Sequence, residues 1–260
     1  MNNLLIDIDA RGVATVTLNR PEIHNAFDDA LIADLSEAFA RLAREASVRA
    51  LVLTGSGANF SAGADLNWMK RMAGYSHEEN LADAMGLAQM LRRLNELSKP
   101  TIARVNGSCF AGATGLVACC DIAIATTEGK FAVNEVRLGL IPATISPYVI
   151  AAIGARQARR LFLAAERISA AEACRIGLVH EVVPADQLDG AVERCTGMLL
   201  QGAAGAQSKA KQLVAAVSGR PVDEALMHQT AQGIADARAS AEGREGVAAF
   251  LEKRRPQWQR

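Results

Sequence analysis

Hydrophobic and polar residues alternate in two short segments near the start of the chain. These segments are residues 4–9 and 13–18, and Arg11-Gly12 lies between them. A period of two is typical of a strand with one buried face, so the pair predicts a β-hairpin. Five further short apolar runs predict buried strands: 50–53, 101–105, 121–125, 131–133 and 178–183.

A second pattern, with apolar residues three or four positions apart, predicts helices. Residues 28–44 show it most clearly, because Leu31, Leu35, Phe39 and Leu42 share one helical face. We expect the other helices at 66–72, 78–97, 112–120, 147–153, 154–164, 169–176, 187–200, 203–217, 221–237 and 242–254.

The predicted elements divide the chain into two parts. All expected strands precede residue 200, and the rest is helical. We therefore predict an α/β core domain over residues 1–200 and a C-terminal helical region over 201–260.

Composition and charge exclude some classes of protein. Half of the 260 residues are apolar, and 28 basic residues balance 28 acidic ones. A chain without net positive charge is a poor candidate for nucleic-acid binding. The five cysteines are odd in number and lack CxxC spacing, which favours reduced thiols in a cytoplasmic protein. We expect no signal peptide, no membrane span and no metal site.

Candidate chemistry gathers in residues 101–142. A predicted strand ends at the Asn106-Gly107 turn, and small residues around Gly112 then begin a helix. Backbone N–H groups at such a helix start can bind a negatively charged oxygen. One carboxylate, Glu135, follows in an apolar stretch that should raise its pKa by desolvation. The pattern indicates chemistry on a carbonyl compound.

Seven segments, taken in order, resemble the enoyl-CoA hydratase/isomerase (crotonase-like) superfamily. They are LNRPEIHNAF (18–27), LVLTGSGANFSAGADL (51–66), KPTIARVNGSCFAGATGL (99–116), CDIAIA (120–125), FAVNEVRLGLIP (131–142), AAEACRIGLVHEVVP (170–184) and AFLEKRRPQW (249–258). Within this superfamily, the sequence resembles most closely the bacterial methylglutaconyl-CoA and carboxygeranoyl-CoA hydratases.

The resemblance implies a fold and an assembly. The fold would consist of repeated ββα units, with two roughly perpendicular sheets wrapped by helices. The C-terminal helical region would pack against neighbouring copies in a homotrimer or a dimer of trimers. The substrate would be an acyl-CoA thioester, and no cofactor would be needed beyond its CoA.

The resemblance also implies the catalytic residues. The N–H groups of Ala64 and Gly112 would hold the thioester oxygen, and Glu135 would move protons beside it. Each position has a plainer interpretation. FSAGAD and AGATG are small-residue turns that also suit close packing, and Glu135 could be a solvated carboxylate paired with Arg137.

The same resemblance implies substrate contacts. The segment after the first donor would line the CoA and acyl path, and the C-terminal lysine would meet CoA phosphates, often across a subunit boundary. His24 and the C-terminal residues could equally be ordinary surface groups. The predicted substrate or CoA contacts are His24, Ala62, Asp65, Leu66, Asn67, Gly115, Phe250 and Lys253.

Gly115 departs from the pattern of the superfamily, in which many hydratases carry a second glutamate. Residues 141–150 also depart, because Ile145, Pro147 and Tyr148 replace a glycine-rich turn and should reshape the acyl pocket. A single glutamate suits double-bond isomerisation as well as hydration. The leading hypothesis is a hydratase, the runner-up is an enoyl-CoA isomerase, and a non-catalytic acyl-CoA- or RNA-binding member is a third possibility.

Overall fold

A six-stranded sheet forms the centre of the molecule, and the computed structural model describes residues 3–259 of the chain. The predicted hairpin is confirmed, with β1 (Leu4–Ile8) antiparallel to β2 (Val13–Leu18). The remaining strands follow β2 in parallel in the order β1-β2-β3-β4-β6-β9. Their bounds are β3 (Ala50–Gly55), β4 (Thr101–Val105), β6 (Ile122–Thr126) and β9 (Glu181–Val183).

A second, three-stranded sheet consists of β5 (Cys109–Phe110), β7 (Lys130–Ala132) and β8 (Ile168–Ser169). The sequence predicts β7 but misses β5 and β8, because two residues are too few to show a period. Phe110 of β5 pairs in parallel with Ala132 of β7. This sheet matters for function because two of its strands lead into the candidate site.

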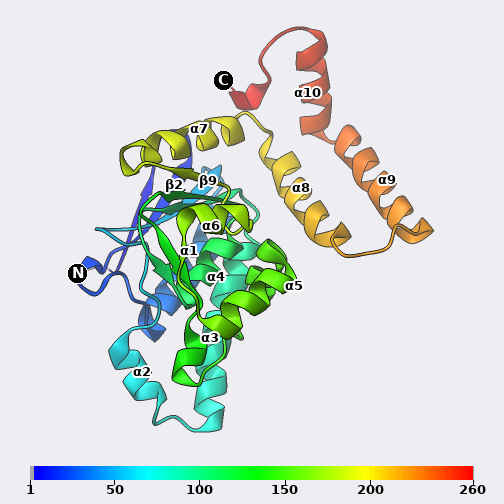
Figure 1. Cartoon of the computed structure of the whole chain (residues 1–260). Helices are drawn as coiled ribbons and strands as arrows, with labels where there is room; N and C mark the ends of the chain where they lie inside the picture. The colour runs from blue at the N-terminus through cyan, green and yellow to red at the C-terminus, as the bar shows by residue number, and fades with distance from the viewer. Residues whose placement is uncertain (1–2, 260) are drawn as a thin grey trace.

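Helices cover the sheets, and their predicted positions are confirmed to within a few residues (Figure 1). Gly154, at φ +75°, interrupts α5 where two separate helices are predicted. The Ser169 side chain caps α6, and the Glu172 side chain pairs with Arg160 and Arg175. The helices of the core are α1 (Asp29–Arg44), α2 (Leu66–Met72), α3 (His77–Asn95), α4 (Gly112–Cys119), α5 (Ser146–Ala164), α6 (Ala170–Arg175) and α7 (Leu188–Leu200).

The hydrophobic core lies between the sheets and the helices. The predicted stripe of α1 (Leu31, Leu35, Phe39 and Leu42) is fully buried. Burying such side chains contributes roughly 1.5–3 kcal/mol each, so this face anchors α1 against the rest of the core. Helix α4 is buried along most of its length, which fixes its N-terminus in the interior.

Three helices extend away from this core as an arm (Figure 1). They are α8 (Ala204–Val217), α9 (Glu224–Ala239) and α10 (Ala241–Leu251). Within the described residues, both hydrophobic core clusters end by Leu200. No helix in residues 3–259 has the length and apolar character needed to cross a membrane.

Candidate active site

The backbone around Ala64 is held by a single bridge to Phe27. The Phe27 N–H donates to the Gly63 carbonyl at 2.8 Å, and the Asp65 N–H donates to the Phe27 carbonyl at 2.9 Å. In a planar trans peptide the C=O and N–H groups point in opposite directions. Since the Gly63 carbonyl faces Phe27, the Ala64 N–H of the same peptide must point away from it.

Gly63 has to be a glycine for this loop to form. Its φ is +90°, and a Cβ atom on it would stand 2.8 Å from the Phe110 carbonyl oxygen. Gly63 therefore lies against the end of β5, just before α4 begins. Two segments far apart in the sequence, 60–65 and 108–112, run side by side here, as the Ser61–Cys109 bridge also shows.

Gly112 opens α4 directly after a strained residue. Ala111 has φ +50° and ψ −127°, a conformation that usually costs a non-glycine residue about 1–3 kcal/mol. Its N–H donates to Ala132 of β7 at 2.7 Å, which holds the turn in place. The strained turn redirects the chain from β5 into α4. It leaves the Gly112 N–H at the first helical position, where it has no partner within the helix.

The two predicted donors both lie next to Phe27. A Cβ atom on Gly112 would stand 2.7 Å from Cζ of the Phe27 ring, while the Phe27 backbone brackets Ala64. Within residues 3–259, neither the Ala64 nor the Gly112 N–H donates a hydrogen bond. Two unused backbone donors therefore lie on neighbouring segments, and one of them is at the positive N-terminal end of α4.

Glu135 begins a short 3-10 helix, η2 (Glu135–Leu138), shortly after β7. Glu135 follows β7, and Gly112 follows β5. Because β7 pairs with β5, the two residues follow neighbouring strands of the same sheet. Its Oε2 atom is buried and has no hydrogen-bond partner among the described residues. No ion pair joins it to Arg137 in that part of the chain, which argues against the solvated, paired carboxylate of the plainer interpretation.

Burial raises the pKa of Glu135 above its ordinary value, in the predicted direction. The N–H groups of Asn134 and Glu135 itself partly offset this by lowering the pKa. The predicted apolar surroundings are only partly correct, because Leu138 and Leu140 are 61% and 53% exposed. A carboxylate with one buried, unpaired oxygen and a raised pKa is suited to accept and return a proton.

Comparison with known proteins identifies the family. The profile of the enoyl-CoA hydratase/isomerase family matches residues 9–260. The chain belongs to the enoyl-CoA hydratase/isomerase family. It is an enzyme of this family, with the crotonase fold, and the resemblance described above is confirmed.

Solved structures and relatives cover nearly the whole chain. An enoyl-CoA hydratase from Shewanella pealeana superposes with a TM-score of 0.96 at 42% identity, covering 99% of this chain and 96% of that one. Two Escherichia coli relatives bear different names. The 2,3-dehydroadipyl-CoA hydratase is 32% identical over 98% of both chains. The 1,2-epoxyphenylacetyl-CoA isomerase is 33% identical over 95% of both chains.

Gly115, where many hydratases of the family carry their second glutamate, faces Ile145. It lies buried in α4, and a Cβ atom on it would stand 2.8 Å from the Ile145 Cβ and even closer to Cγ2. The two departures from the family pattern are thus one packing arrangement, since the Ile145 side chain fills the space above Gly115. Tyr148 lies near the charges of Arg92 on α3 and of Glu96, the residue that ends this helix, and its role in shaping the acyl pocket stays a prediction.

The predicted CoA contacts are spread over two regions. Ala62, Leu66 and Asn67 are exposed beside Ala64, whereas Asp65 is buried and caps α2. His24 is exposed, and its carbonyl accepts from the Ala62 N–H at 2.9 Å.

Phe250 and Lys253 lie elsewhere, at the end of α10 on the arm (Figure 1). Phe250 is 82% exposed. The structure does not bring these two residues to the site of their own chain.

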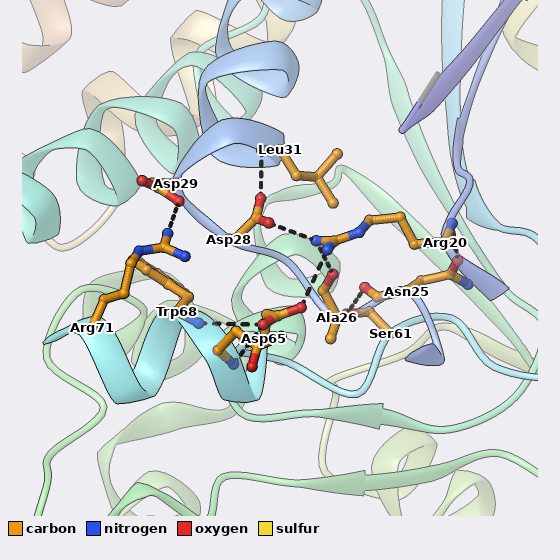
Figure 2. A network of polar contacts seen from close by, with 11 residues as sticks. Arg20, Asn25, Ala26, Asp28, Asp29, Leu31, Ser61, Asp65, Trp68 and Arg71 are labelled. Atoms are coloured by element: carbon orange, nitrogen blue, oxygen red, sulfur yellow. Dashed lines mark hydrogen bonds and ion pairs between the residues drawn. The ribbon is translucent and has the colours of Figure 1, made fainter. Parts of the chain in front are cut away.

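A polar network next to Ala64 is missed by the sequence analysis. It centres on Arg20, with Asn25, Asp28, Ser61 and Asp65 around it (Figure 2). The only available signal is the segment LNRPEIHNAF, in which Arg20 and Asn25 are two polar residues among several. Their burial and their partners depend on contacts with residues 56–65, which no local pattern reveals.

Proposed function

We propose that this enzyme adds water across the 2,3-double bond of an enoyl-CoA thioester. The Ala64 and Gly112 N–H groups would donate to the thioester oxygen and stabilise the enolate that forms during the reaction. Glu135 would take a proton from water as the water oxygen bonds to C3. The same proton would then be returned to C2. This chemistry uses no cofactor beyond the CoA of the substrate.

The observations that carry the proposal are the unpaired, buried Oε2 of Glu135 and the two unused backbone donors, which lie on segments linked through the β5–β7 pair and the Ser61–Cys109 bridge. Unsatisfied buried polar groups are rare in folded proteins and require an explanation. A thioester oxygen would satisfy the two donors, and a water or a substrate hydrogen would satisfy the acceptor. The acyl group is proposed to be branched or dicarboxylic, as the name of the dehydroadipyl-CoA relative also suggests.

The second candidate function is isomerisation of an enoyl-CoA double bond. Ile145 packed on Gly115 favours it, because a second carboxylate is not needed for this reaction. Glu135 would remove a proton from C2 of a 3-enoyl-CoA and return it to C4. A relative named 1,2-epoxyphenylacetyl-CoA isomerase, at a similar level of identity, is consistent with an isomerase but acts on an epoxide by its name.

One experiment separates these functions. The protein is incubated in H₂¹⁸O with crotonyl-CoA, methylglutaconyl-CoA or a 3-enoyl-CoA, and the products are analysed by mass spectrometry. A hydratase adds the mass of labelled water to a 2-enoyl-CoA. An isomerase moves the double bond without a mass change. Tight CoA binding without turnover would identify a non-catalytic member and contradict both proposals.

We further propose that the arm assembles the enzyme into a trimer or a dimer of trimers. Helices α8 and α9 enclose a hollow of about 660 Å³ with an apolar lining that includes Leu213 and Ile234. These side chains are 47% and 51% exposed. Neighbouring copies would cover them, and Phe250 and Lys253 would then meet the CoA bound by another copy.

A further inference from the structure

We propose that Arg20 is a positioning residue that sets the direction of the Ala64 N–H, and thereby the strength of the oxyanion site. This inference rests on the proposed function of Ala64 as a donor. Arg20 does not touch the reacting atoms in this scheme. It acts through the two segments that hold the Gly63–Ala64 peptide.

The Arg20 guanidinium joins two carboxylates that each cap a helix (Figure 2). Nη1 lies 3.0 Å from Oδ2 of Asp28, and Nη2 lies 3.2 Å from Oδ2 of Asp65. The other oxygen of each carboxylate accepts from a helix start. Asp28 Oδ1 accepts from the N–H of Leu31 in α1, and Asp65 Oδ1 accepts from that of Asn67 in α2.

All three charged side chains are largely shielded from water. The exposed fractions are 16% for Arg20, 18% for Asp28 and 9% for Asp65. Ion pairs in such surroundings are screened far less than surface pairs. The two helix N-termini supply further positive potential, which balances the excess negative charge of two carboxylates around one cation.

Arg20, Asp28 and Asp65, which we call the clamp, flank the Phe27–Ala64 bridge. Asp28 directly follows Phe27, and Asp65 directly follows Ala64. Arg20 Nη1 also donates to the Ala26 carbonyl at 2.9 Å, on the other side of Phe27. The cation therefore fixes the residues before and after Phe27, as well as the residue after Ala64. The two hydrogen bonds of the bridge keep their geometry only while these flanking residues stay in place.

A second set of contacts leads from the Arg20 backbone to the same loop. The Arg20 N–H donates to Asn25 Oδ1 at 2.9 Å, and Asn25 is fully buried. The Asn25 carbonyl accepts from Ser61 Oγ at 2.8 Å, and this hydroxyl accepts from the Gly63 N–H at 3.1 Å. Both sides of Gly63 are thus tied to the segment that Arg20 holds.

Only arginine can make this set of contacts. Its planar fork presents several N–H donors at fixed angles, whereas the single ammonium of lysine acts as a point charge. A lysine at position 20 would reach one carboxylate but would not span Asp28, Asp65 and the Ala26 carbonyl together. The geometry therefore predicts that the Arg20→Lys variant keeps only part of the positioning of the Ala64 N–H that Arg20 provides.

The test compares Arg20→Ala, Arg20→Lys and Asp65→Asn with Arg71→Ala as the control. Asn can still cap α2, so Asp65→Asn removes charge from the clamp with less effect on folding. Arg71 pairs with Asp29 between the same two helices, but both side chains are about half exposed and lie outside the clamp (Figure 2).

The first readout does not need turnover. Butyryl-CoA with a ¹³C-labelled thioester carbonyl is bound to each variant, and the C=O stretch is measured by infrared difference spectroscopy. Donors aimed at the oxygen lower the stretching frequency. We expect Arg20→Ala to lose most of this shift, Arg20→Lys and Asp65→Asn to lose part of it, and Arg71→Ala to keep it.

The second readout is kinetic. Misplacing a catalytic group by about 1 Å costs about 100-fold in rate, so we expect Arg20→Ala to lower kcat about 10- to 100-fold. KM should change less than about threefold, because the loss concerns the transition state. An unchanged carbonyl shift in folded Arg20→Ala, or equal losses in Arg71→Ala, would overturn the proposal. Lack of turnover by the wild type would refute the proposed function, while the carbonyl shift would still test the clamp.

Discussion

Ile145 occupies the space in which a side chain at position 115 would have to stand. A Cβ atom on Gly115 would come within 2.8 Å of the Ile145 Cβ. The same Cβ atom would lie 3.5 Å from Cδ2 of Leu91. Real Cβ atoms do not approach this closely, so a glutamate at position 115 cannot coexist with Ile145 in this position. Gly115 and Ile145 therefore form a packed pair, in which a larger residue at position 115 requires a smaller one at position 145.

This pair predicts strong coupling between substitutions. Gly115→Glu alone should destabilise the protein by more than about 1–3 kcal/mol, because it overpacks the core and buries a charge. Ile145→Ala alone should cost about 2–5 kcal/mol through the cavity it leaves. In the double variant each change relieves the other, so the loss should fall short of the sum by about 1–3 kcal/mol.

Urea unfolding of the four proteins measures this coupling. Strict additivity would contradict the packing described here. The double variant should also shift the product ratio towards hydration, because a second carboxylate then faces the site. A ratio equal to that of Ile145→Ala would show that the new carboxylate does not reach the substrate.

Glu135→Gln should lower turnover by about 100- to 10,000-fold, the range that general acid–base catalysis contributes. The amide keeps the shape of the side chain, so CoA binding measured by calorimetry should survive. Glu128→Gln is the matched control, because Glu128 is exposed in the turn between β6 and β7. Turnover that remains within about threefold of wild type would remove Glu135 from the proposed mechanism.

The raised pKa of Glu135 predicts how activity and stability depend on pH. As a base, Glu135 must be ionised, so kcat should fall as the pH drops through the pKa of this group, which lies above the ordinary range of a glutamate. Because folding favours the protonated form, this group stabilises the fold at low pH and loses that contribution as the pH rises through its folded pKa. Glu135→Gln should therefore raise the melting temperature at pH 7, and the gain should fade towards pH 4. An equal gain at both pH values would contradict the burial of the charge.

Ala111→Gly should stabilise the fold while slowing catalysis. Glycine adopts φ +50° without the strain that Ala111 carries, and removing such strain is worth about 1–3 kcal/mol. The freer backbone would hold the Gly112 N–H less firmly, so we expect kcat to fall. The control is Ala82→Gly on the exposed face of α3, which should lose about 1 kcal/mol. Equal destabilisation in both variants would show that Ala111 is not strained.

Charges on the arm should weaken assembly if its apolar hollow is an interface. Leu213→Asp and Ile234→Asp should shift the sedimentation of the wild-type oligomer towards the 27.5 kDa monomer. Val222→Asp is the control, because this residue is 81% exposed between α8 and α9 and does not line the hollow. A wild-type protein that sediments as a monomer would refute the proposed trimer.

Periodicity in the sequence predicts much of the fold. The hairpin, the buried stripe of α1 and the break at Gly154 are local patterns, and each appears where the pattern places it. Two strands of the second sheet escape the periodic pattern, because β5 and β8 are two residues long and exist only through their pairing with β7. The ordered segments also indicate the family, and with it the candidate residues Ala64, Gly112 and Glu135.

The sequence by itself determined most of the helices and the longer strands, and it indicated the family and its candidate catalytic groups, because these depend on residue types at short or fixed spacing. Only the tertiary structure decided that the Ala64 N–H turns away from Phe27, that Ile145 fills the space above Gly115 and that Arg20 joins two helix caps. Each of these relationships joins residues far apart in the chain. Direction, close contact and burial are properties of packed atoms, and local patterns of side chains do not carry them.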